Sequence, residues 1–211
     1  MDASRIAAEL GPFLSAPLTE AQIAAVSSYM DLLLRWNARV NLTAIRDPNE
    51  MLTRHFGESI FAAQYLFPGS QAAASGHLID LGSGAGFPGL PIKIWAPELR
   101  VTLIESNQKK ATFLREVVRS LKLTGVEVFV GRAESYVGDR GDVVTLRAVE
   151  RFEQALPTAA GLVAPGGRLA LLIGGAQFER AEQLAAGFKW EKPVAIPLSE
   201  ARVLAFGSHA G

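Results

Sequence analysis

The stretch LIDLGSGAGFPGLPIKI, residues 78–94, decides the fold of this chain. A short apolar segment ends in Asp80 and is followed by four glycines and two prolines. Gly84, Gly86 and Gly89 match the G-x-G-x-x-G pattern of a strand-to-helix turn that approaches a nucleotide-bearing ligand. Glycine permits positive φ there and leaves room for ligand atoms beside the backbone. The stretch therefore predicts a strand, a ligand-binding turn and a helix.

Short apolar segments recur on both sides of helical patterns after this turn. Ala111, Leu114 and Val117 fall on one face of an expected helix over residues 107–121. Alternation of strands and helices predicts an α/β fold with a doubly wound, mostly parallel, Rossmann-like sheet. The tail should add an antiparallel pair at one edge, residues 194–196 and 203–206. The expected parallel strands span residues 77–81, 100–104, 126–130, 142–146 and 167–173.

The first part of the chain has a different rhythm, and we expect residues 1–70 to form a helical extension packed on the core. Thr19 and Gln22 make a capping box before an apolar periodic run. Asn49 is expected to cap a second helix that runs to Leu66. Residues 67–76 indicate a linker, so residues 71–211 form the ligand-binding domain as one compact unit.

Composition limits the possible functions. Apolar residues make up 49% of the 211, and 21 Lys and Arg balance 21 Asp and Glu, so a polyanion must be met by local basic patches. The absence of cysteine excludes disulfides, thiolate zinc sites and cysteine nucleophiles, and we expect no metal site. We also expect a cytoplasmic monomer with no membrane segment. Two basic clusters are candidate patches or simply solvated faces: Arg35, Arg39, Arg46 and Arg54, and Lys109, Lys110, Arg115, Arg119 and Lys122.

The residues around the turn favour one cofactor. Asp80, two residues before Gly82, would repel a pyrophosphate but suits S-adenosylmethionine, which is cationic and carries no phosphate. Glu105 ends the next strand, where an acid binds ribose hydroxyls, although NAD needs the same acid. Ala133 and Glu134 follow the third strand and are placed to meet an adenine; Glu134 is alternatively an acid favoured by a helix dipole. S-adenosylmethionine is favoured, and an NAD-linked oxidoreductase stays an alternative.

The sequence excludes or disfavours several of the base atoms that could accept a methyl group. Methylation at carbon-5 of a pyrimidine needs a cysteine, which is absent. The fourth strand ends in Thr145-Leu146-Arg147 and lacks the Asn/Asp-Pro-Pro segment used for exocyclic amines. Guanine N7 has a lone pair and no proton to remove. The side chain that most commonly recognises guanine is an arginine that donates to O6 and N7. The chemistry thus permits N7 without demonstrating it.

Several motifs together resemble a known family. NLTAIRDP at residues 41–48, Arg54-His55, Ser59, DLGSGAGFPGLP at residues 80–91 and Arg147-Ala148 are similar to the RsmG (GidB) methyltransferases. These bacterial enzymes methylate N7 of one guanine in a loop of 16S ribosomal RNA. The resemblance covers roughly residues 36–174 and implies the class I S-adenosylmethionine methyltransferase fold, with 16S ribosomal RNA or the small ribosomal subunit as partner.

The resemblance also implies the site. Arg147 would stand between cofactor and guanine as the catalytic residue, unless it forms an ion pair with Glu150 or Asp142. Arg46, Arg54 and His55 would face RNA. Glu105 would hold the ribose, and the turn pattern adds Asp80, Gly84 and Gly86 to the cofactor contacts that the resemblance implies, which are Gly82, Phe87, Ala133, Glu134 and Arg147.

Two positions depart from the family pattern. Ile173 stands where a lysine is usual, and Arg202 stands where a histidine is usual. Arg202 or Lys93 is a candidate to compensate. A second possibility is a non-catalytic, ribosome-associated module that keeps the cofactor pocket.

Overall fold

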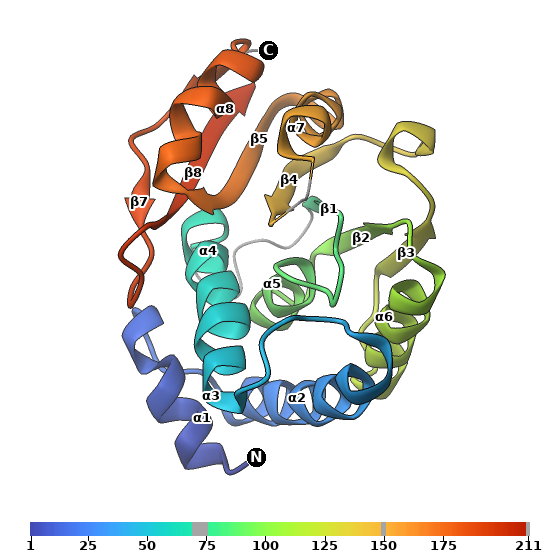
Figure 1. The fold of residues 1–211 in the computed structure, drawn as a ribbon, viewed down its shortest axis with the longest axis vertical. Helices are drawn as coiled ribbons and strands as arrows, with labels where there is room; N and C mark the ends of the chain where they lie inside the picture. Colours follow the sequence, from blue (N-terminus) through green and yellow to red (C-terminus); the bar gives the residue numbers. More distant parts are fainter. Residues whose placement is uncertain (69–75, 149–150, 210–211) are drawn as a thin grey trace.

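A computed structural model describes residues 1–68, 76–148 and 151–209 of the chain. Its frame is an eight-stranded sheet with the order β3-β2-β1-β4-β5-β8-β6, and β7 pairs with β8 (Figure 1). Strands β1 to β5 run parallel, whereas β8 is antiparallel to β5, β6 and β7. Because β1 lies between β2 and β4, the winding direction of the sheet reverses there, and ligands bind at such a point in doubly wound folds.

All the expected strands are present. They are β1 (His77–Leu81), β2 (Arg100–Glu105), β3 (Val126–Val130), β4 (Gly141–Arg147), β5 (Val163–Gly174), β6 (Phe188–Trp190), β7 (Val194–Ala195) and β8 (Arg202–His209). The tail pair β7 and β8 is confirmed, but β8 is inside the sheet and β6 lies beyond it at the edge. Strand β6 was missed because three residues are too few to show a period of two.

Helices cover both faces of the sheet. On one side lie α1 (Ala3–Leu10), α2 (Glu20–Val40), α3 (Pro48–Met51), η2 (Leu52–Gly57), α4 (Glu58–Leu66), α5 (Gly89–Trp95) and α6 (Gln108–Ser120); on the other lie α7 (Phe152–Gly161) and α8 (Phe178–Leu184). Successive residues of β1 point to opposite faces. Leu78 therefore joins the core with α2, and Ile79 joins the core with α7.

The N-terminal extension shares the first of these cores. The capping box of α2 is confirmed, with the Gln22 N–H donating to Thr19 Oγ1 at 3.2 Å. The expected cap at Asn49 is wrong: Asp47 Oδ1 accepts from the N–H groups of Asn49 (3.0 Å) and Glu50 (2.8 Å). Pro48 then occupies the first helical position, which suits its fixed φ. The expected boundary after residue 70 and most of the linker lie outside the described residues.

Two features of the extension bear on the site. Residues Leu52–Gly57 form a π-helical turn, a rare conformation found frequently at functional sites, and this turn carries Arg54 and His55. Tyr29 of α2 is fully buried, and its hydroxyl donates to the carbonyl of Ala85 inside the glycine turn. Within the described ranges, no helix is long and apolar enough to cross a bilayer.

Candidate active site

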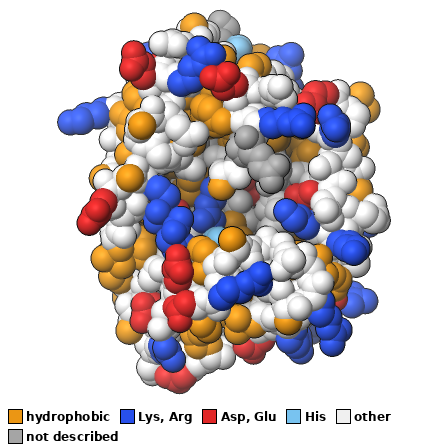
Figure 2. All heavy atoms as spheres, viewed as in Figure 1, with side chains coloured by type: hydrophobic (Ala, Val, Ile, Leu, Met, Phe, Trp, Pro, Cys, Tyr) orange, Lys and Arg blue, Asp and Glu red, His pale blue; other side chains and the backbone are white. Residues whose placement is uncertain are grey.

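Two cavities open on either side of the glycine turn, at the carboxyl ends of the central strands. The larger, about 680 Å³, is bordered by the turn, by residues 41–44, and by His55, Glu105 and Arg147. The smaller, about 350 Å³, is bordered by Ala133 and Glu134. Gly82 and Ser106 line both cavities, so the two are adjacent. Figure 2 shows a central hollow with Lys and Arg side chains on both sides and a histidine beside it.

The backbone of the turn has the conformation that its glycines predict. Gly82, Gly84 and Gly86 have φ of 71°, 59° and 91°, in the left-handed region that favours glycine. Four N–H groups of the turn donate to backbone carbonyls. Those of Gly82 and Ser83 donate to the Ile104 carbonyl, and those of Gly86 and Phe87 donate to the Ser83 carbonyl.

Two carboxylate side chains accept hydrogen bonds from further N–H groups of the turn. Gly84 donates to Glu105 Oε2 at 2.8 Å, and Gly89 donates to Asp80 Oδ2 at 3.1 Å. A pyrophosphate bound at such a turn requires free N–H groups. Because these are used internally, the turn is a poor anion site.

Asp80 lies beneath the turn and lines neither cavity, which corrects its expected contact with the ligand. Its side chain is buried, and Oδ1 accepts from Thr145 Oγ1 at 2.8 Å because the register of β1 and β4 sets the two residues side by side. Burial raises the pKa of Asp80 to about 6. Gly86 also lines neither cavity: a Cβ there would overlap the Tyr29 hydroxyl and lie 2.6 Å from Leu90 Cδ1.

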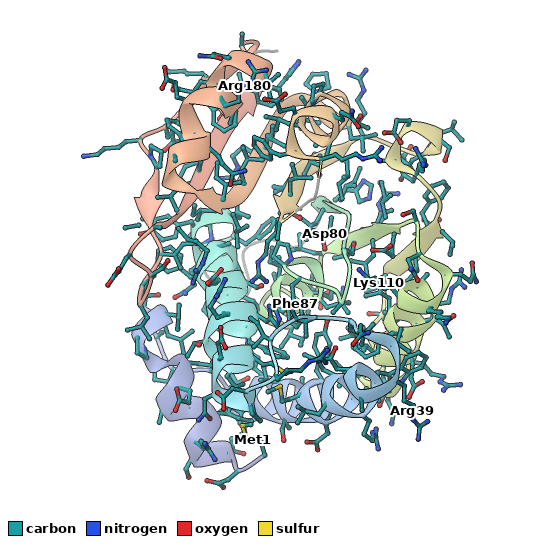
Figure 3. The ribbon with its side chains drawn as sticks, in the orientation of Figure 1. Met1, Arg39, Asp80, Phe87, Lys110 and Arg180 are labelled. Atoms are coloured by element: carbon teal, nitrogen blue, oxygen red, sulfur yellow. The ribbon has the colours of Figure 1, made fainter. Side chains whose placement is uncertain are left out.

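Glu105 faces the larger cavity, as expected from its place at the end of β2. Its carboxylate is fixed by the Gly84 N–H and by the Asn107 N–H, which donates to Oε1 at 2.7 Å. Each carboxylate oxygen keeps a further lone pair for a ligand hydroxyl. Asn107 in turn caps α6, whose Lys110 lies across the hollow from Phe87 (Figure 3).

Arg147, at the end of β4, reaches the larger cavity with a side chain that is only 10% exposed. Its Nη2 donates to the Arg54 carbonyl at 2.6 Å and to His55 Nδ1 at 3.2 Å. Since a guanidinium only donates, His55 Nδ1 is an acceptor and the proton sits on Nε2, which donates to Thr43 Oγ1 at 2.8 Å. The His55 ring stacks on Phe87, with ring centres 4.7 Å apart.

The sequence did not reveal the partner of Arg147. The guanidinium lies 3.6 Å from Glu58 Oε2, whose side chain is 2% exposed. Asp142 instead accepts from the His77 N–H, and Glu150 lies outside the described residues. The only sign of Glu58 in the sequence was a single acidic residue within an otherwise apolar helical segment. Tyr29 was likewise recognisable only as one aromatic residue on the buried face of α2.

Other expected residues are placed as follows. Arg46 is exposed at the end of the 41–46 segment, lines neither cavity, and donates to Asn41 Oδ1 at 2.8 Å. Arg54 is partly exposed and pairs with Glu50 and Glu58. Lys93 cannot compensate for the missing lysine, because it is buried and its Nζ donates to the carbonyls of Pro97 and Leu99.

Comparison with known proteins agrees with this geometry. Residues 22–202 match the family model described as rRNA small subunit methyltransferase G. The chain belongs to this family. A relative named ribosomal RNA small subunit methyltransferase G from Xanthomonas axonopodis pv. citri is 40% identical over 87% of this chain and 84% of its own. Another of that name from Stenotrophomonas maltophilia is 42% identical over 81% of this chain and 77% of its own.

Solved structures share the methyltransferase fold. P. horikoshii TYW2 in complex with MeSAdo matches with a TM-score of 0.60 and 17% identity, over 74% of this chain and 63% of its own. Fibrillarin, a Methanococcus jannaschii pre-rRNA processing protein, matches with a TM-score of 0.58 and 18% identity, over 72% of this chain and 74% of its own. The fold class expected from the sequence is thereby confirmed.

We predict that His55 stays neutral at pH values well below those at which a histidine usually takes up a proton. Burial, followed by Arg147 and Arg54, lowers its pKa to about 3. As the pH falls from 6.5 towards 3, the unfolded chain takes up a proton that the folded chain refuses, so the free energy of unfolding falls by about 1.4 kcal/mol per pH unit. His55→Gln keeps an acceptor for Arg147 but cannot titrate, so its stability should depend less on pH in this window.

Urea unfolding of both proteins between pH 7 and 5 measures this difference, and the opposite contribution of Asp80 cancels because both proteins contain it. Histidine resonances in NMR give the pKa directly, with the His55→Gln spectrum as the assignment. A His55 midpoint near 6.5, or parallel stability curves, would contradict the prediction.

Proposed function

We propose that this protein transfers the methyl group of S-adenosylmethionine to N7 of a guanine in a loop of 16S ribosomal RNA. It acts as a monomer in the cytoplasm, on the RNA or on the small ribosomal subunit. Membership of the small-subunit methyltransferase G family supports the reaction. The observation that carries the cofactor assignment is the turn whose N–H groups are used internally, between cavities lined by carboxylates.

The cavities fit a bulky, cationic nucleoside. A Cβ built on Gly84 would meet nothing closer than the Gly82 carbonyl at 3.8 Å, so the space beside this glycine is open for a ligand. Glu105 and Glu134 are acceptors for ribose hydroxyls and an adenine amino group, and Ala133 lies beside Glu134. Gly82 spans both cavities, and Phe87 lines the larger one.

Residues of this chain then supply positioning and electrostatics. When bound, S-adenosylmethionine would supply an electrophilic methyl group for in-line transfer to the guanine N7 lone pair, with S-adenosylhomocysteine as the leaving group and no base required. Arg147 lines the larger cavity and is suited to donate to guanine O6, which orients N7. His55 is held by Thr43, Arg147 and Phe87, so it fixes the arginine rather than exchanging protons.

The competing functions have weaker support. An NAD-linked oxidoreductase requires a diphosphate at the turn, where the N–H groups of Gly82, Ser83, Gly84, Gly86, Phe87 and Gly89 already donate within the protein. A non-catalytic module is suggested only by Ile173 in place of the family's usual lysine, and that side chain is buried in the core with α7 and α8.

A direct assay separates these functions. Purified protein is incubated with labelled S-adenosylmethionine and small subunits from a strain that lacks the methyl group, and 7-methylguanosine is located by borohydride and aniline cleavage. One labelled guanine supports the proposal. RNA binding without transfer indicates the module, and calorimetric binding of NADH but not of S-adenosylmethionine indicates the oxidoreductase.

We predict that Gly84→Ala weakens cofactor binding without preventing folding. The added Cβ meets no protein atom within 3.4 Å, but it enters the cavity and strains a residue with φ of 59°. Gly166→Ala is the matched control, since Gly166 has φ of 73° with open space around it and lines neither cavity. Both variants should lose about 1–2 kcal/mol of stability. Only Gly84→Ala should lower the calorimetric affinity for S-adenosylmethionine, by tenfold or more; equal affinities would contradict this role.

We predict that Arg147→Lys slows methyl transfer roughly 10- to 100-fold, because a lysine keeps the charge beside Glu58 but cannot donate in a fork. Single-turnover assays on undermethylated subunits measure the rate. Arg180→Lys is the control, since Arg180 lies on α8, far from the hollow, in an exposed ion pair with Glu153 (Figure 3). An unchanged rate for Arg147→Lys would remove its assigned role.

A further inference from the structure

Three arginines from distant parts of the chain converge on one buried carboxylate. Glu58 Oε1 lies 2.5 Å from Arg202 Nη2, 2.7 Å from Arg202 Nε and 3.6 Å from Arg54 Nε. Glu58 Oε2 lies 3.6 Å from Arg147 Nη2. We call these four residues the Glu58 cluster. Strand β8, the π-helical turn and strand β4 each contribute one arginine, so the cluster exists only in the folded chain.

The charges of the Glu58 cluster do not balance. Three guanidinium groups and one carboxylate give a formal charge of +2, and the exposed Glu50, which is 3.3 Å from Arg54, lowers this only to +1. Isolated positive charge near a protein surface attracts anions strongly when neighbouring groups are desolvated. The Glu58 cluster, with Glu50 included, therefore keeps an excess of positive charge beside the larger cavity.

The cluster also has an accessible side. Arg147 is almost covered, but the side chains of Arg54 and Arg202 are 39% and 27% exposed. Arg202 uses Nε and Nη2 for Glu58, and its Nη1 makes no hydrogen bond to the described part of the chain. Lys and Arg side chains gather over α4 on one side of the hollow in Figure 2. An anion can thus reach Arg54 and Arg202 while Glu58 holds them from beneath.

We propose that Arg54 and Arg202, oriented by Glu58, bind a backbone phosphate of the ribosomal RNA next to the target guanine. This proposal rests on the proposed function, because it takes a nucleotide to be the occupant of the larger cavity. In RNA a phosphate lies one sugar away from its base. A base held at Arg147 thus brings a phosphate to the same group of arginines, and planar guanidinium groups recognise phosphate oxygens with paired hydrogen bonds.

Glu58 has a defined part in this site. A carboxylate buried to this extent is costly unless it is paired; here Arg202 donates to Oε1, and Arg54 and Arg147 each lie 3.6 Å from the carboxylate. In return it fixes guanidinium groups that would otherwise repel each other. Because it neutralises only one of three charges, it orients the arginines without cancelling their attraction for RNA.

The test compares Arg202→Gln with the unaltered protein. Binding of a labelled 16S loop oligonucleotide is followed by fluorescence anisotropy from 50 to 200 mM KCl, and S-adenosylmethionine binding is measured by calorimetry. Loss of one phosphate contact should weaken RNA binding several-fold and reduce the slope of log affinity against log salt by about one. Cofactor affinity should change less than about threefold. Arg202→Lys should keep most of the slope, and Arg180→Gln should change nothing.

The outcomes are distinguishable. If the unaltered protein binds and methylates RNA while Arg202→Gln keeps its affinity and slope, the Glu58 cluster is only a structural ion pair and the proposal is overturned. Equal losses of RNA and cofactor binding also overturn it. If Arg202→Gln does not fold, Arg54→Gln provides the same comparison. If the unaltered protein shows no salt-dependent RNA binding, the proposed function itself fails.

Discussion

The buried carboxylate of Asp80 is the constraint on which the site depends. It accepts from the Gly89 N–H at the start of α5 and from Thr145 Oγ1 on β4, and so it joins three elements where the sheet reverses its winding. An unpaired carboxylate at this depth would be very costly, so both bonds must form together with the turn. The same arrangement uses the Gly89 N–H, a group that a diphosphate at the helix start would need. It therefore shapes the turn and also decides which class of ligand suits it.

Residues of the N-terminal extension contact and position side chains of this site. Tyr29 of α2 bonds the Ala85 carbonyl and stacks on Phe87, with ring centres 5.3 Å apart. Phe87 stacks in turn on His55, and His55 accepts from Arg147. A continuous series of contacts thus runs from a helix outside the sheet to the arginine beside the larger cavity. Helix α4 adds Glu58, so the extension positions Arg147 from two sides.

The fold class could be predicted from sequence patterns, and for the candidate site these patterns indicated which strand ends lie beside the turn. Carboxyl ends of parallel strands meet at one edge, so Glu105 was expected near the turn, whereas the family resemblance implied the position of Arg147; both line the larger cavity. Asp80 and Gly86 were expected to contact the cofactor but line neither cavity. A sequence motif does not indicate whether a side chain, or the Cβ position of a glycine, faces the ligand or the protein core. Glu58 and its contact with Arg202 join residues 144 positions apart, and no local period records such a pairing.

A crystal structure with S-adenosylhomocysteine tests the central claim most directly, because it shows what occupies the cavities beside the turn. The adenosyl part should lie between Glu105 and the Ala133–Glu134 corner, and the sulfur should point towards Arg147, with the turn N–H bonds unchanged. A phosphorylated cofactor bound over Gly82 to Gly86, with its oxygens on freed N–H groups, would contradict the assignment of the ligand. So would S-adenosylhomocysteine bound away from both cavities.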